Sequence, residues 1–216
     1  GSGKSYYDSS KDAVYVPIRS PKISEVVEFC NTVGIEGMSV TVPHKETVLI
    51  ETNSIDSEVS EIRACNTIVK KDGRWFGYNT DARGFQRSLL EFLGVKNLRR
   101  CKVAIIGAGG AARAIAYVVK KLKGKACIFN RTVANAKAIA DKYGFAFSQL
   151  GPDCLYDLDY YSDIIIQTTS VGSGSVGPSS EKNDPLYFYN FKGTESLYDI
   201  VYTPEVTPIM TRAMAA

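Results

Sequence analysis

Two charged residues in the first half of the chain each follow a short apolar run, and together they could carry out proton transfer. Lys45 comes just after the β-branched run 37–42, and Asp81 comes just after the aromatic run 75–78. If both runs are strands of one small sheet, their carboxyl ends could bring the two side chains together. An ammonium group beside a carbonyl oxygen can stabilise developing negative charge and supply a proton. From spacing alone, surface placement is the commoner outcome for lysine and aspartate.

A glycine turn in the second half of the chain predicts a nucleotide site. The apolar run 103–106 leads into a series of small residues, and an alanine-rich stretch follows that ends near Gly124. The small residues are Gly107, Ala108, Gly109, Gly110 and Ala111. Gly107 can take the tight turn, and Gly109 lets the backbone approach a pyrophosphate whose oxygens bind the N–H groups of the following helix. The alternative is a glycine turn in an α/β fold that binds no nucleotide.

The end of the next apolar run, 126–129, indicates which dinucleotide fits. An NAD site commonly has an acidic residue about 20 positions beyond the glycines, where it holds the ribose 2′-hydroxyl. Here the run is followed by Asn130, Arg131 and Thr132, and no acid stands among them. A carboxylate would repel a 2′-phosphate, whereas the planar guanidinium group binds it well. The sequence therefore favours NADP over NAD, with a solvated arginine as the alternative.

Hydrophobic periodicity predicts the helices that position these residues. Apolar residues recur at helical spacing over 23–33 and again over 81–93. Gly34 and Gly94 stand where each pattern stops, as a helix-ending glycine does. From residue 101 onward, strand-like and helix-like segments alternate, which is typical of a parallel sheet with helices on its faces.

The strands of the first half are shorter. We expect strands at 14–16 and 37–42, and a helix that begins near Glu46. The runs 67–69 and 75–78 flank a Lys-Asp-Gly sequence, and Asp-Gly between two such runs is a strong signal for a β-hairpin.

Composition excludes several classes of partner. The net charge is only +3, so neither nucleic acid nor an anionic membrane surface is expected to bind. Five scattered cysteines and a single histidine, His44, indicate reduced structural thiols and not a metal site. No apolar run approaches the roughly 20 residues that span a bilayer, and residues 1–11 are polar, as in a tag or leader. A cytoplasmic protein is the expectation.

Six motifs, taken in order, resemble those of a known family. They read S-V-T-V-P-H-K at 39–45, A-C-N-T at 64–67, G-Y-N-T-D at 77–81, G-A-G-G-A-A-R at 107–113, N-R-T at 130–132 and Y-D-I-V-Y-T-P at 198–204. Their order and spacing resemble the shikimate dehydrogenase family from about residue 13 to the C-terminus. No single motif would be specific, but the ordered set is.

The resemblance implies an α/β enzyme with its active site in the cleft between two domains. A smaller α/β substrate-binding domain is expected at 1–88 and a Rossmann-type parallel-sheet NADP-binding domain at 89–204. Residues 205–216 are expected to begin a C-terminal helical segment that returns to the first domain. The implied reaction is the reversible, NADPH-dependent reduction of 3-dehydroshikimate to shikimate, a step of aromatic amino acid and chorismate biosynthesis.

The resemblance also implies roles for particular residues. Lys45 corresponds to the catalytic lysine, a general acid and base, and Asp81 to its paired aspartate. Thr41 and Asn66 correspond to ligands of substrate hydroxyls, and Tyr202 to a tyrosine that faces the substrate. The implied cofactor-binding residues are Gly107, Ala108, Gly109, Gly110 and Ala111 at the diphosphate, Asn130, Arg131 and Thr132 at the adenosine phosphate, and Ile200 near the nicotinamide. His44 is not expected to take part in the chemistry, and Trp75 is interpreted as a packing residue.

Three features depart from the family pattern. Residues 1–12 contain Ser2, Ser5, Ser9 and Ser10 but no Ser-x-Ser segment of the kind that holds the substrate carboxylate. The glutamine-bearing C-terminal helix of the family is also missing, so the sequence is expected to be incomplete. Asn135 stands where NADP-dependent members often have a second arginine.

Several alternatives remain open at this level. One is a quinate/shikimate dehydrogenase that uses NAD, and another is a catalytically inactive, nucleotide-binding regulator, against which the retained lysine and aspartate argue. The chain could also be one module of a larger enzyme, fused to a dehydroquinate dehydratase domain. A monomer and a homodimer are both compatible with the sequence, and the expected partner is the small-molecule substrate.

Overall fold

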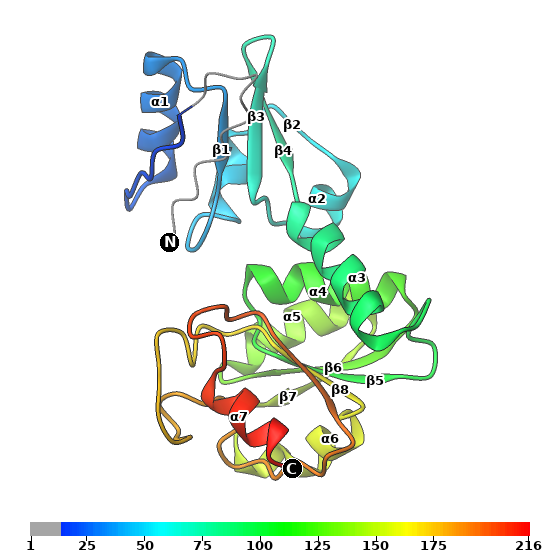
Figure 1. Ribbon diagram of the computed structural model, residues 1–216. Helices are drawn as coiled ribbons and strands as arrows, with labels where there is room; N and C mark the ends of the chain where they lie inside the picture. Colours follow the sequence, from blue (N-terminus) through cyan, green and yellow to red (C-terminus); the bar gives the residue numbers. More distant parts are fainter. Residues whose placement is uncertain (1–13) are drawn as a thin grey trace.

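The computed structural model describes residues 14–216, which form two lobes joined by one long helix (Figure 1). The first lobe contains α1 (Ile23–Val33), β1 (Gly37–Ser39), η1 (Thr47–Glu51), β2 (Ser54–Ile55), α2 (Ser57–Ile62), β3 (Thr67–Lys71) and β4 (Arg74–Tyr78). The joining helix is α3 (Thr80–Leu93). The second lobe contains β5 (Lys102–Ile106), α4 (Gly110–Lys121), β6 (Lys125–Asn130), α5 (Val133–Tyr143), β7 (Ala146–Gln149), η2 (Pro152–Cys154), α6 (Leu155–Tyr160), β8 (Ile164–Gln167), β9 (Ser196–Asp199) and α7 (Pro208–Met214).

The first lobe is built on a mixed four-stranded sheet in the order β1-β3-β4-β2. Helix α1 buries Val26, Val27 and Cys30 against it and ends at Gly34, whose φ of 77° is left-handed, as predicted. The β3–β4 hairpin is confirmed: Asp72 and Gly73 both have positive φ, the conformation that a two-residue type I′ turn requires. The predicted strand 37–42 is shorter than expected, because only β1 pairs with β3. The helix expected near residue 46 is the 3-10 helix η1.

The predicted strand at 14–16 is wrong. Within the described chain, Val14, Tyr15 and Val16 pair with no strand, and their side chains are 87%, 74% and 51% exposed. Apolar residues of high β-propensity form a strand only where a neighbouring backbone satisfies their N–H and C=O groups. In the described structure β1 pairs with β3 alone, so it leaves this run unpaired.

Helix α3 carries the chain from one sheet to the other. Asn79 caps its start by accepting a hydrogen bond from the Ala82 N–H at 3.1 Å, and Gly94 ends it with a φ of 63°, as predicted. Phe85 and Leu89 are buried on its inner face, where the helix packs on α4.

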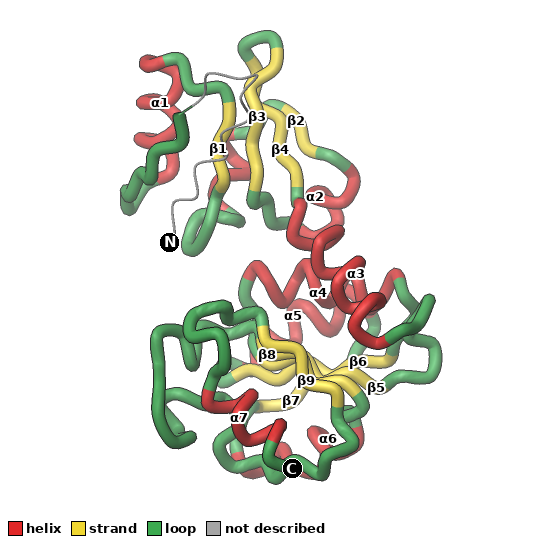
Figure 2. The backbone as a smooth tube through the Cα atoms, viewed as in Figure 1, coloured by secondary structure: helices red, strands yellow, loops and turns green. Residues whose placement is uncertain are grey.

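The second lobe is a five-stranded, fully parallel sheet in the order β7-β6-β5-β8-β9, which confirms the predicted Rossmann-type fold. Its central strand β5 has four fully buried residues, 103–106, because helices cover both faces. Helices α4 and α5 lie on one face, and α6 and α7 on the other (Figures 1 and 2). The strand order reverses between β5 and β8, and ligands of such sheets bind at the carboxyl ends of the strands at that point.

The last helix, α7, packs on the second lobe. Ile209 joins its core, and the Arg212 guanidinium donates to the buried Asp184 carboxylate at 2.7 Å. That the segment 205–216 returns toward the first lobe stays a prediction. Among residues 14–216, no helix has both the length and the hydropathy needed to cross a membrane.

Candidate active site

Lys45 and Asp81 lie together between the two lobes, as the sequence predicts. The Lys45 ammonium donates to the Asp81 Oδ2 at 2.6 Å. The Lys45 carbonyl accepts from the Cys65 N–H at 2.7 Å, which holds the turn after β1 against the start of β3. Asp81 is the second residue of α3, where the helix dipole favours a carboxylate. The lysine side chain is 18% exposed and the aspartate 41%, so both can be reached from the cleft.

Asn66 fixes the orientation of the aspartate. Its Nδ2 donates to Asp81 Oδ1 at 2.7 Å and to Thr80 Oγ1 at 2.9 Å, while its Oδ1 accepts from the Thr80 N–H at 2.9 Å. Both carboxylate oxygens of Asp81 are therefore engaged, one by Lys45 and the other by Asn66. The result is a lysine held at one defined position by a chain of hydrogen bonds.

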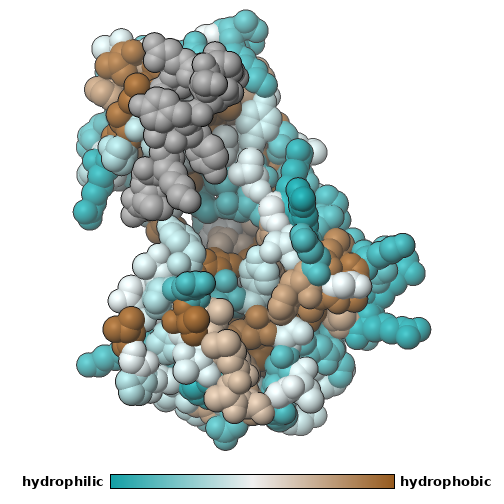
Figure 3. Space-filling model, viewed as in Figure 1, coloured by the Kyte–Doolittle hydropathy of each residue, from teal (hydrophilic) through white to brown (hydrophobic). Residues whose placement is uncertain are grey.

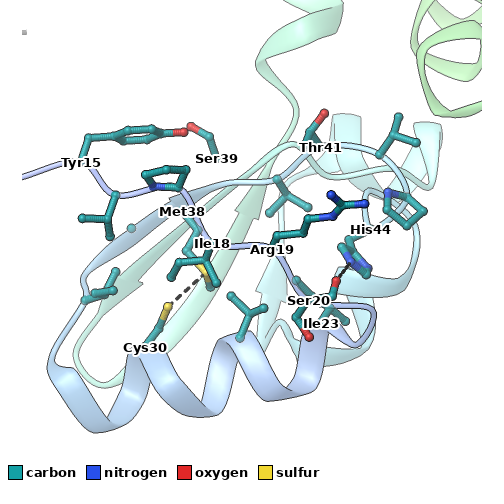
Figure 4. A pocket seen from close by; sticks show the side chains of 18 of the residues that line it. Tyr15, Ile18, Arg19, Ser20, Ile23, Cys30, Met38, Ser39, Thr41 and His44 are labelled. Carbon is teal, nitrogen blue, oxygen red and sulfur yellow. Dashed lines mark hydrogen bonds between the residues drawn. The ribbon is translucent and has the colours of Figure 1, made fainter. Parts of the chain in front are cut away.

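The other expected substrate ligands, Thr41 and Tyr202, are exposed. Thr41, four residues before Lys45, lines an open pocket of about 850 Å³ in the first lobe (Figure 4). His44 lines the same pocket, and its Nε2 lies 2.8 Å from the Ser20 carbonyl. The imidazole ring therefore connects the segment before α1 to the turn that carries Lys45. Tyr202 is 85% exposed and forms no hydrogen bond through its hydroxyl within the described structure.

Trp75 packs as expected. The ring is 3% exposed in the core of the first lobe, and its Nε1 donates to Asn31 Oδ1 at 3.1 Å.

The glycine turn has the geometry that a dinucleotide phosphate needs. Gly107 has a φ of 113°, and a Cβ atom there would lie 2.5 Å from Thr168 Oγ1 and 3.0 Å from Thr169 Cγ2. Gly109 caps α4 with open space where its side chain would stand, and no side chain of the described chain accepts from the first N–H groups of the helix. Those groups are thus available to an anion.

The end of β6 has a cationic group with space around it. Arg131 is exposed and forms no ion pair with any residue in 14–216. Asn130 Nδ2 donates to the Thr132 carbonyl at 3.0 Å, which shapes the loop, and the Thr132 hydroxyl is not used as a cap for α5 within the described structure. These residues fit a phosphate ester.

The Lys45–Asp81 pair and the glycine turn come together at Gly110. A Cβ atom on this residue would lie 3.6 Å from both Cβ and Cδ of Lys45 and 3.9 Å from Ala64 Cβ. The first residue of α4 thus lies beside the Lys45 side chain. Figure 3 shows the molecular surface hollowed between the two lobes.

Sequence reasoning missed two residues that lie against the glycine turn, Thr168 and Thr169. Thr168 Oγ1 donates to the Ile106 carbonyl at 2.7 Å, which fixes the hydroxyl directly under Gly107. The signal was present, because both threonines follow the apolar strand β8 in the same way that Lys45 follows its own run. Ile200 lies on the same side, partly buried against the core below α4, with its N–H donating to the Gln167 carbonyl at 3.2 Å.

The cysteines fit their expected structural role. Burial raises the pKa of Cys30, Cys65, Cys101 and Cys154, and it raises the pKa of Cys127 to about 12. A thiol with so high a pKa is a poor nucleophile. No group of three or more metal-binding side chains occurs among residues 14–216.

Comparison with known proteins places the chain in a family. The model of the shikimate dehydrogenase substrate binding domain matches residues 3–68, and that of shikimate / quinate 5-dehydrogenase matches residues 91–180. A shikimate dehydrogenase (NADP(+)) from Shouchella clausii is 33% identical over 212 residues, which cover 96% of this chain and 75% of that protein. The chain belongs to the shikimate dehydrogenase family. The relative of the same name from Methanothermobacter thermautotrophicus is 35% identical over 95% of this chain and 73% of its own length.

Solved structures of the shikimate dehydrogenase family agree with the fold. A shikimate dehydrogenase in complex with NADP+ superposes with a TM-score of 0.76 at 32% identity, covering 92% of this chain and 69% of the other. The enzyme from Aquifex aeolicus gives a TM-score of 0.77 at 27% identity, covering 92% and 70%. The predicted family, its α/β fold and its nucleotide-binding sheet are therefore confirmed.

Proposed function

We propose that this protein is an NADP-dependent shikimate dehydrogenase that interconverts 3-dehydroshikimate and shikimate in the cleft between its lobes. The observation that carries the proposal is the Lys45–Asp81 hydrogen bond of 2.6 Å, placed beside the first turn of α4. The relatives named shikimate dehydrogenase (NADP(+)) support it, as does the Thermus thermophilus enzyme solved with NADP(H) and shikimate, at 26% identity. We assign the substrate lobe to residues up to 88, inside α3, and the nucleotide lobe to 89–204.

The residues present fit NADP(H). The space under Gly107 admits no side chain, the first N–H groups of α4 carry no protein partner among the described residues, and Arg131 is exposed without an ion pair there. We propose that the turn 107–111 holds the diphosphate, that Asn130, Arg131 and Thr132 hold the 2′-phosphate, and that Ile200 contacts the nicotinamide. When bound, NADPH supplies the hydride that reduces the ketone carbon.

Lys45 supplies the other half of the reaction. As the carbonyl carbon is reduced, its oxygen gains negative charge, and the Lys45 ammonium donates a proton to that oxygen. The neutral amine takes the proton back in the reverse direction. Asp81, held by Asn66, orients the ammonium and accepts from a substrate hydroxyl. In this proposal Thr41, Asn66 and Tyr202 bind the remaining hydroxyl groups of the substrate.

The test is substrate-dependent reduction of NADP+, followed at 340 nm and compared across shikimate, quinate, NADP+ and NAD+. The proposal expects shikimate with NADP+ to give the highest kcat/KM. A higher value with quinate, or with NAD+ as the cofactor, would favour the alternative of a quinate/shikimate dehydrogenase that uses NAD. NADPH binding with no turnover of either acid would favour the inactive regulator.

A further inference from the structure

An ion pair joins the residue after Lys45 to the helix at the glycine turn. Arg113 Nη2 lies 3.3 Å from Glu46 Oε2, and neither side chain is fully buried. Glu46 belongs to the first lobe and Arg113 to the first turns of α4 in the second. The pair therefore bridges the two lobes directly beside the proposed active site.

The ion pair is the second of two adjacent contacts. Lys45 and Glu46 are consecutive, while Gly110 and Arg113 are three apart in α4 and so lie on the same helix face. The Gly110 position meets the lysine stem, with its Cβ direction 3.6 Å from Lys45 Cβ and Cδ. Lys45 therefore lies beside the start of the helix, and the next residue, Glu46, forms an ion pair with it. Two neighbouring contacts fix the orientation of the turn, which one contact alone would not.

The guanidinium group of Arg113 is partly buried, where an unpaired polar group is unfavourable. Its Nε is buried and has no hydrogen-bond partner among residues 14–216. A buried donor without an acceptor costs free energy, so interactions elsewhere on the side chain must offset that cost. Within the described structure, the Glu46 carboxylate is the one ion-pair partner of this guanidinium. An ion pair between partly exposed side chains contributes little to global stability, so we attribute its main effect to geometry.

We propose that Glu46 and Arg113 are positioning residues that anchor the segment between β1 and η1, which carries Lys45 and is called the Lys45 turn, on α4. The helix whose N-terminus faces the dinucleotide phosphates would then also set the distance between Lys45 and the reacting carbonyl. This inference rests on the proposed function for its effect on turnover, but the anchoring itself can be measured without any substrate.

The experiment measures the accessibility of the Lys45 amine by reductive methylation and peptide mass spectrometry. The variants are Glu46→Gln, Arg113→Gln and the charge swap Glu46→Arg with Arg113→Glu, all without cofactor. Glu61→Lys is the matched control, because it removes another ion pair between the lobes, with Lys142 at 3.6 Å, that does not involve the Lys45 turn.

Each single variant is expected to methylate at Lys45 faster by about threefold or more, as a locally opened segment does. The charge swap is expected to restore the parent rate at Lys45, and Glu61→Lys to leave it unchanged. Unchanged labelling of Lys45 in Glu46→Gln, or a swap no better than the single variants, would overturn the proposal.

Kinetics add a second readout. Glu46→Gln is expected to lower kcat by about tenfold, since small misplacements of a catalytic group cost that much or more, while the NADPH dissociation constant stays within a factor of about 3. If Arg113→Gln bound NADPH more weakly while Glu46→Gln changed neither the labelling of Lys45 nor kcat, Arg113 would be a cofactor ligand and the positioning role would be overturned. A parent inactive on shikimate would contradict the proposed function alone, because the labelling result still decides whether the pair anchors Lys45.

Discussion

Replacing Gly107 by alanine tests whether the glycine turn is constrained as the structure indicates. At a φ of 113°, a residue with a Cβ atom is strained, and the new atom would lie 2.5 Å from Thr168 Oγ1. The threonine cannot move freely, because its hydroxyl donates to the Ile106 carbonyl at 2.7 Å and its β-branched side chain is stiff. Either the turn shifts or that hydrogen bond breaks.

The expected loss of stability can be estimated from these two contributions. Backbone strain at such a φ costs on the order of 1–3 kcal/mol, and the lost hydrogen bond costs roughly 1 kcal/mol more. For a chain of this size each kcal/mol lowers Tm by about 2–4 °C, so Gly107→Ala should melt roughly 5–15 °C below the parent. Dinucleotide binding should be lost as well, because the turn that approaches the phosphates is displaced.

Two matched glycine variants separate strain from ligand contact. Gly109 has ordinary φ and ψ and open space around it, so Gly109→Ala should keep the parent Tm and weaken NADPH binding, since the added methyl group obstructs the phosphate approach. Gly84 lies exposed inside α3, and Gly84→Ala should stabilise the protein by about 0.5–1 kcal/mol through helix propensity. Differential scanning fluorimetry and NADPH titration check all three variants. A Gly107→Ala protein that melts within about 2 °C of the parent, equivalent to less than about 1 kcal/mol, would refute the reasoning.

Three further predictions concern charge. Burial raises the pKa of the Glu58 carboxyl, but its hydrogen bonds and ion pairs with Arg83 and Lys121 outweigh burial and hold the pKa below the ordinary 4.5. The stabilising contribution of the ionised carboxylate is therefore present above pH 4.5 and is lost as pH falls through the folded-state pKa. Urea unfolding should show that Glu58→Gln lowers the free energy of unfolding by about 1–2 kcal/mol at pH 7 and by little in acid. Burial raises the pKa of Asp199 above 3.8, so the parent protein loses stability as pH rises from 3.8 through the folded-state pKa. Urea unfolding should show the free energy of unfolding of Asp199→Asn increasing relative to that of the parent from pH 3.8 upward. A difference that stays constant with pH would contradict this. Arg131→Ala should raise KM for NADP+ while leaving KM for NAD+ nearly unchanged, and equal effects on both would exclude a 2′-phosphate contact.

Local signals allowed much of the fold to be predicted. The Asp72-Gly73 turn, the helix-ending Gly34 and Gly94, and the strand-glycine-helix unit at Gly107 each depend on residues within a few positions, and the structure confirms all of them. The same local reasoning failed at 14–16. Whether a run becomes a strand depends on a partner backbone far along the chain, which composition and spacing do not reveal.

The site was predictable in its residue types but not in its connections. Lys45 and Asp81 are 36 positions apart, and their contact came within reach of prediction because several motifs appear in a fixed order. The use of Asn66 to hold Asp81 depends on hydrogen-bond directions that only the three-dimensional arrangement fixes. The Glu46–Arg113 pair depends on how two lobes dock, and neither residue is distinctive in the sequence alone.

The most direct test of the account is the Lys45→Ala variant, assayed for shikimate-dependent NADP+ reduction and, separately, for NADPH binding. The variant should lose about 10²–10⁴-fold in kcat, the usual contribution of a positioned acid–base group, while its NADPH dissociation constant stays within a factor of about 3 of the parent value. A variant that binds NADPH normally and keeps more than about a tenth of the parent kcat, a loss too small for such a group, would contradict the assignment of Lys45 as the proton donor.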